Sequence, residues 1–166
     1  MGLRFINADV IANELKIGAY EAAAAAEQLR REMVARRESF VFETVLSDPE
    51  GAKVDFLRDA AAAGYDVLLC FIGVDSPATS RERVALRVMQ GGHGVPKEKL
   101  AARYSRTMQN LTRALKVLPH VLVYDNSRLG VAHRFRFVAE YRHGIPVRLD
   151  AELPAWFGTL LSTLKA

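Results

Sequence analysis

The sequence of 166 residues contains one cysteine, Cys70, and therefore cannot form an internal disulfide framework. No apolar run reaches the roughly 18 residues that a membrane-spanning helix needs, and the first residues lack the apolar region of a signal peptide. With 11 glycines and 6 prolines, the composition also excludes collagen-like and low-complexity chains. These absences predict a cytoplasmic globular protein that has no membrane partner.

Half of the residues are hydrophobic and a quarter are charged, which is typical of one globular domain with a substantial core. We find no internal repeat and no linker long enough to divide the chain. We therefore expect a single domain over residues 1–166.

The net charge is +4, and arginine outnumbers lysine by 17 to 6. Because the guanidinium group offers a planar fork of donors, this bias favours a phosphorylated ligand. A GC-rich genome, which favours arginine and alanine codons, explains the bias equally well. Nucleic acid is not an expected partner, since the basic helices contain no recognised binding motif and few aromatic side chains between the arginines.

Short apolar runs at 3–6, 40–42, 67–74 and 120–124 predict strands, and helical patterns lie between them. The nearly continuous run at 67–74 predicts a strand buried on both faces. Ser47-Asp48-Pro49-Glu50 predicts the start of a helix that ends near residue 63, and basic residues late in the helix at 20–37 complement its dipole. Segments 135–141 and 147–149 predict a C-terminal β-hairpin. The fold class is therefore α/β with a mainly parallel sheet.

Polar residues follow each of the four predicted parallel strands. In such sheets, ligands gather at the carboxyl ends of the strands. The pattern favours a functional cleft, although strands often end in turns that are rich in aspartate and asparagine. The residues are Asn7, Asp9, Glu43, Thr44, Asp75, Asp125 and Asn126.

Several segments, taken in order, resemble the zeta-toxin-like group of P-loop kinases, and the bacterial members labelled predicted ABC-type ATPases are the most similar. The resemblance spans residues 3–127 and rests on FINADVIA (5–12), SFVFETVLS (39–47), RVALRVMQGGH (83–93) and VYDNS (123–127). It implies a P-loop-kinase-like three-layer sandwich. The implied activity is phosphoryl transfer from ATP, with Mg²⁺, to a hydroxyl of a small or nucleotide-sugar substrate. Zeta toxins proper phosphorylate UDP-N-acetylglucosamine and are held in check by an antitoxin.

The phosphate-binding loop of this family, G-x-x-x-x-G-K-[ST], does not occur in the sequence, since none of the 11 glycines precedes a lysine. The resemblance places this loop after a strand inside the sheet, and the loss of that strand would leave two neighbours without a partner. We consider a truncated gene model or chain, a natural remnant that no longer holds ATP well, and a loop supplied by another chain. The alternative function is a degenerate, non-catalytic module that binds a nucleotide or another phosphorylated ligand.

The resemblance implies that Asp9 is the catalytic base and that Glu43 orients the acceptor or a water on magnesium. Asn7 and Thr44 are candidates for substrate binding. The structural alternatives are that Asp9 caps the following helix, that Glu43 is a solvated strand end and that Asn7 shapes the turn.

A lid is expected over residues 78–118, because Arg83 and Arg87 share one helical face just before Gly91-Gly92. The resemblance places the lid arginine, a catalytic residue, at Arg87. The alternative is a solvated basic helix face. Candidate nucleotide- or phosphate-binding residues are Arg83, His93, Arg103, Arg106, Asp125 and Asn126.

No metal site is expected, because His120, His133, His143 and Cys70 lack the spacing of zinc ligands. The implied partners are ATP and a hydroxyl-bearing small molecule, together with an antitoxin or a second copy that covers exposed strand edges.

Overall fold

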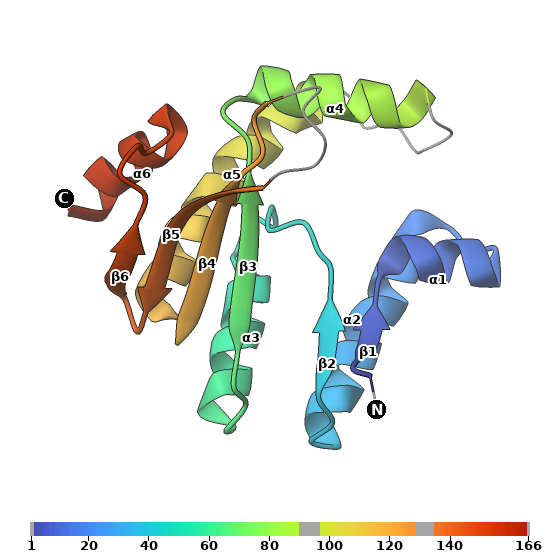
Figure 1. Ribbon diagram of the computed structural model, residues 1–166. Helices are drawn as coiled ribbons and strands as arrows, with labels where there is room; N and C mark the ends of the chain where they lie inside the picture. Colours follow the sequence, from blue (N-terminus) through green and yellow to red (C-terminus); the bar gives the residue numbers. More distant parts are fainter. Residues whose placement is uncertain (1, 90–96, 129–134, 166) are drawn as a thin grey trace. The chain divides into compact units, whose positions relative to one another are not determined.

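The computed structural model describes residues 2–89, 97–128 and 135–165, and it has the α/β fold that the sequence predicts (Figure 1). The chain forms two compact units, residues 1–45 and residues 46–166. Each unit has its own sheet.

The first unit is a β-α-α-β arrangement. Its elements are β1 (Arg4–Ile6), α1 (Ala8–Leu15), α2 (Ala19–Ala35) and β2 (Phe40–Phe42). The two strands are parallel, so that both lead into the loops at one edge of the sheet. Ile6 packs against Ala26 and Met33 of α2, and these three residues form a buried hydrophobic cluster in the unit.

We expected the basic residues late in α2 to complement the helix dipole, but Arg30 is placed differently. It is buried, and its guanidinium lies 5.0 Å from the ring centroid of Phe42. Burial lowers the pKa of this group. Arg31 instead pairs with Glu27 on the exposed face, at 2.7 Å. The contact with the Phe42 ring, and not the helix terminus, therefore decides the position of Arg30.

The second unit has a four-stranded sheet in the order β3-β4-β5-β6. The β3–β4 pair is parallel, and the two pairs that follow are antiparallel, which confirms the predicted C-terminal hairpin. The elements are α3 (Ala52–Ala62), β3 (Leu68–Gly73), α4 (Pro77–Met89), α5 (Lys97–Val117), β4 (His120–Asp125), β5 (Arg136–Arg142), β6 (Ile145–Leu149) and α6 (Ala155–Lys165).

Fully buried side chains hold this unit together. Those of α5 follow the spacing of one helical face, and those of β4 alternate along the strand, as a helix packed on a sheet requires. Phe157 of α6 is the largest of them. The others include Leu111, Leu115, Leu118, Val121, Val123 and Val138.

The predicted helix start at Ser47–Glu50 is wrong. Pro49 and Glu50 form a turn, and α3 begins only at Ala52, after Gly51 in the left-handed region (φ 75°). Side chains of α5 bind the carbonyls of this segment, which holds it outside the helix. An added Cβ at Gly51 would lie 2.5 Å from an Arg113 nitrogen, so both the backbone angle and the close approach favour glycine there.

The prediction that the run at 67–74 is buried on both faces is also wrong. Phe71 and Gly73 are buried, whereas Leu68, Cys70 and Ile72 are exposed. Within the unit, the side chains on one face of β3 are covered and those on the other face are not.

The described strands form a two-stranded sheet and a four-stranded sheet. Both β2 and β3 are edge strands, and each pairs in parallel on one side only.

Candidate functional site

Asn7 organises the carboxyl edge of the β1–β2 sheet. It is the N-cap of α1, and its side-chain oxygen accepts hydrogen bonds from the backbone N–H groups of Asp9 (2.7 Å) and Val10 (3.2 Å). Its amide nitrogen donates to Glu43 Oε2 at 2.8 Å. One side chain thus links the first turn of α1, which carries Asp9, to the end of β2.

The alternative interpretation that Asp9 caps α1 is wrong, because the N-cap of this helix is Asn7. Asp9, Glu43 and Thr44 are all exposed. In the part of the chain that the structure describes, the Asp9 carboxylate makes no hydrogen bond or ion pair. Its negative charge in the first turn of α1 is favourable to the helix dipole. The carboxylate is therefore free to accept a proton from a ligand, and its catalytic role stays a prediction.

A second group of polar side chains lies in the other unit, at the carboxyl end of β3, where the chain leads into α4. Ser76 Oγ accepts a hydrogen bond from the backbone N–H of Thr79 (3.1 Å), and the Thr79 hydroxyl donates to Asp75 Oδ1 (2.5 Å). These bonds satisfy groups at the start of α4. Asp75 is thus part of the cap of this helix.

Asp125 ends β4 with an almost fully buried side chain. Its Oδ1 accepts hydrogen bonds from Trp156 Nε1 (2.9 Å) and from the Ser127 hydroxyl (2.5 Å). The backbone N–H of Asn126 donates to Gly73 O at 2.8 Å, which ties the ends of β3 and β4 together. The nucleotide-binding role of Asp125 and Asn126 stays a prediction, because the bonds observed for them lie within the protein.

Arg83 connects α4 to the same edge. Its Nη2 donates to the backbone carbonyl of Asn126, while its Nε is buried and has no hydrogen-bond partner within the described residues. Arg87 lies on α4, but its side chain is outside the described part of the chain, and His93 lies outside the described residues. Of the two predicted lid arginines, the structure therefore describes the side chain of Arg83 alone.

Three side chains of α5 anchor the segment that follows β2. Arg106 Nε donates to Ser47 O (2.9 Å), Asn110 Nδ2 to Leu46 O (3.1 Å) and Asp48 O (2.9 Å), and Arg113 Nη1 to Glu50 O (3.0 Å). The spacing of four and then three residues puts these donors on one helical face. Arg106, a predicted phosphate ligand, thus has a structural bond as well. Arg103 is half-buried, and it has no hydrogen bond or ion pair among the described residues.

Asn110→Ala is expected to lower the free energy of unfolding by about 1–3 kcal/mol, because two carbonyls lose their donor in a buried place. Urea denaturation followed by circular dichroism measures the change. Gln109→Ala is the control, since Gln109 is the exposed neighbour on the same helix. Equal stability of the two variants would show that the anchor contributes nothing.

Tyr104 lies near both acidic strand ends of this unit. Its hydroxyl donates to Val74 O at 3.1 Å. Burial raises the pKa of Tyr104, and the negative charges of Asp75 and Asp125 raise it further. The phenol therefore stays protonated at neutral pH and acts as a hydrogen-bond donor at this edge.

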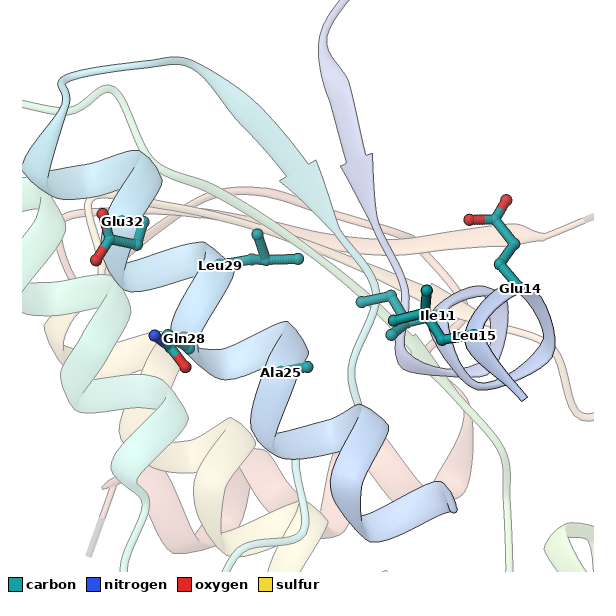
Figure 2. Close-up of a pocket in the computed structure, with 7 residues that line it drawn as sticks. All are labelled: Ile11, Glu14, Leu15, Ala25, Gln28, Leu29 and Glu32. Atoms are coloured by element: carbon teal, nitrogen blue, oxygen red, sulfur yellow. The ribbon is translucent and has the colours of Figure 1, made fainter. Parts of the chain in front are cut away.

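A separate groove of about 380 Å³ lies between α1 and α2 (Figure 2). Apolar side chains of Ile11, Leu15 and Leu29 extend into it from the two helices, and Glu14 and Glu32 flank them. None of the predicted site residues lines this groove. The carboxylates of Asp9 and Glu43 at the strand ends therefore lie outside this groove, and their predicted roles do not involve it.

Among the described residues, no group of three or more His, Cys, Asp or Glu side chains is placed to hold a metal ion. None of the described helices is both long and apolar enough to cross a membrane.

The family model described as "Zeta toxin" matches residues 17–135, which is well over half of the chain. The chain belongs to the zeta toxin family. This membership confirms the resemblance read from the sequence and places the chain in a kinase-like P-loop family, for which nucleotide binding is implied. No curated protein and no solved structure matches the chain.

The described residues do not form the phosphate-binding loop that zeta toxin family membership implies. The strand-to-helix turns after β1 and β3 are Asn7 and Val74–Ser76, and neither is a glycine-rich loop that could surround a triphosphate with backbone N–H groups. In addition, the described residues contain no metal-holding cluster.

The sequence did not single out Asn110, Tyr104 or Trp156 as residues of the strand-end regions. The spacing of Arg106, Asn110 and Arg113 was a usable signal, because polar residues repeated on one face of a long helix indicate a buried or bound face. Trp156 is the only tryptophan of the chain, but its contact with Asp125 joins residues 31 positions apart. No local pattern indicates such a contact.

Proposed function

We propose that this chain carries the acceptor side of an ATP-dependent phosphotransferase of the zeta toxin family, which acts on a hydroxyl of a small or nucleotide-sugar substrate. The observation that supports this most is the Asn7 side chain, which holds the turn bearing Asp9 and the Glu43 carboxylate at one sheet edge. In this proposal Asp9 accepts the proton of the acceptor hydroxyl, and Glu43 orients that hydroxyl. Thr44 contributes a further hydrogen-bonding group.

On the other side of the reaction, the predicted lid residues Arg83 and Arg87, together with His93 and Arg103, would bind phosphate. Arg106, Asp125 and Asn126 would hold or shape the nucleotide site. The nucleotide would be ATP with Mg²⁺, and an antitoxin is the proposed protein partner. A cytoplasmic location belongs to the same proposal.

A non-catalytic module that binds a phosphorylated ligand is the second candidate. It is favoured by the lack of the G-x-x-x-x-G-K-[ST] loop, and by the bonds from Arg83 and Arg106 to backbone carbonyls of the protein itself. In that case Asp9 and Glu43 would serve binding, and no hydroxyl would be activated.

Calorimetric titration with ATP and with UDP-N-acetylglucosamine tests the two candidates. The chain and an N-terminally extended form that carries a phosphate-binding loop are compared. We expect tight ATP binding and transfer of labelled phosphate only for the extended form, because the loop supplies the donors for the triphosphate. ATP binding by neither form would favour the non-catalytic module. Transfer by the chain without the loop would contradict our assignment of the phosphate site.

A further inference from the structure

Trp156 of α6 contacts both strand ends at the carboxyl edge of the β3–β4 pair. Its Nε1 donates a hydrogen bond to Asp125 Oδ1 at 2.9 Å, and both side chains are buried. Its ring lies so close to Gly73 that an added Cβ there would come within 2.5 Å of it. One residue of α6 therefore holds the last residue of β3 and the last residue of β4 in place.

The turn that follows β4 is fixed by three hydrogen bonds. The Ser127 hydroxyl donates to the same Asp125 oxygen that the indole binds, at 2.5 Å, and this bond closes the turn. The backbone N–H of Asn126 donates to Gly73 O at 2.8 Å, and the Asn126 carbonyl accepts a hydrogen bond from Arg83 Nη2 of α4. Because the first two bonds orient the turn, they also decide where its carbonyl meets the arginine.

The two helices after β3 are both tied to this edge. The bond to Asn126 O restricts the long Arg83 side chain, and the guanidinium group keeps further N–H donors for an anionic ligand. On α5, the Tyr104 hydroxyl donates to Val74 O at 3.1 Å. The residue that follows each strand end held by Trp156 thus gives its carbonyl to one of these helices.

We propose that Trp156 is a positioning residue for Arg83. Through Asp125 and the Asn126 carbonyl, it sets the place of the guanidinium group at the carboxyl edge of β3 and β4. The inference rests on the proposed function in so far as Arg83 binds phosphate there. A side chain that is fixed before the ligand arrives loses less conformational entropy on binding. The place of the side chain in the free protein is measurable without any ligand.

Nuclear magnetic resonance of the Arg83 Nε–H group tests the positioning in the full chain. This nitrogen is buried, so we expect its hydrogen to exchange slowly with water. The loss of the signal in Arg83→Lys identifies it. Trp156→Phe keeps an aromatic ring and removes the donor to the buried carboxylate. It should accelerate the exchange about tenfold, which is the effect expected for the loss of one buried hydrogen bond.

Two controls separate positioning from a general loss of stability. The Arg106 Nε–H group donates to Ser47 O at 2.9 Å and is the internal reference, because this bond involves neither α6 nor the turn after β4. Leu160→Ala is the matched variant, since Leu160 is a buried residue of α6 (5% exposed) and takes no part in the bond to Asp125. It should lower stability and leave the exchange at Arg83, relative to Arg106, unchanged.

Ser127→Ala tests the same set of bonds without a change in the core, since it removes the other donor to Asp125 Oδ1. We expect faster exchange at Arg83 Nε–H in this variant as well. Ser127→Thr keeps the hydroxyl and should restore the slow rate.

Unchanged exchange at Arg83 in Trp156→Phe, or equal acceleration at Arg83 and Arg106, would overturn the positioning role. An effect of the same size in Leu160→Ala would overturn it too. Circular dichroism shows whether Trp156→Phe is folded. If it is not, the comparison of the two Ser127 variants decides in the same way.

Calorimetric titration of the N-terminally extended form with ATP tests the link to phosphate binding. We expect Trp156→Phe to weaken ATP binding about tenfold, as the displacement of one charged hydrogen-bond donor predicts. Equal ATP binding with and without the substitution, together with the expected exchange result, would contradict the phosphate-binding role of Arg83. The positioning of Arg83 by Trp156 would then stand on the exchange measurement.

Discussion

Asp9→Asn is expected to slow phosphoryl transfer by about 10²–10⁴-fold in the N-terminally extended form, which is the usual contribution of a positioned general base. Asparagine has a similar shape but cannot accept the acceptor's proton. Because Asn7 caps α1 and Asp9 is exposed, the loss of stability should stay below about 1 kcal/mol. Transfer of labelled phosphate to UDP-N-acetylglucosamine, followed in a single turnover, measures the rate.

Glu14→Gln is the control for this experiment. Glu14 lies on the same helix, is exposed and forms no ion pair among the described residues, so its loss tests only the removal of one negative charge from α1. We expect its transfer rate to match that of the unchanged protein. Undiminished transfer by Asp9→Asn would exclude Asp9 as the base, and an equal loss in Glu14→Gln would point to a general effect of charge.

Trp156→Ala is expected to lower the free energy of unfolding of the second unit by about 3–5 kcal/mol, as for other large buried aromatic residues. The indole contacts Phe71 (ring centroids 6.3 Å apart) and Phe157 (5.5 Å). It lies against Gly73, where an added Cβ would come within 2.5 Å of the ring. Its removal therefore leaves a cavity in the core and also takes one donor from the buried Asp125 carboxylate.

Trp156→Phe separates these two effects. It keeps an aromatic ring but removes the N–H donor, so we expect a loss of about 1–3 kcal/mol. Phe135→Ala is the control, because Phe135 is an exposed aromatic residue outside the strands and should change stability by less than about 0.5 kcal/mol. Guanidinium denaturation followed by circular dichroism gives all three values. If Trp156→Ala cost no more than Phe135→Ala, the role assigned to the indole would be wrong.

The elements of this protein could be predicted well where the signal is local. The apolar runs at 40–42 and 120–124 became β2 (Phe40–Phe42) and β4 (His120–Asp125), and the hairpin became β5 and β6. The start of α3 could not be predicted, because Pro49 and its neighbours have the composition of a helix start. Donors more than 50 residues away in the sequence, on α5, hold that segment in another conformation. A local pattern carries no information about such bonds.

In the candidate site, too, local patterns could be predicted, whereas contacts between distant residues could not. The polar ends of consecutive parallel strands, together with the order of the family's segments, were enough to select Asn7, Asp9 and Glu43 as neighbours. The sequence could not say that Asn7 performs the capping attributed to Asp9, since either side chain suits an N-cap. Which of the two residues caps the helix depends on where α1 begins, and the hydrogen bond from Asn7 to Glu43 is part of that arrangement.

The sequence by itself determined the α/β class, the family and the absence of a lysine-bearing phosphate loop, because these depend on residue order and local periodicity. Only the tertiary structure decided that the strands divide into two sheets, that β3 is exposed on one face and that α5 holds the segment after β2. Strand exposure depends on which neighbours are present, and hydrogen bonds between distant residues depend on packing. Neither is encoded in a local window of the chain.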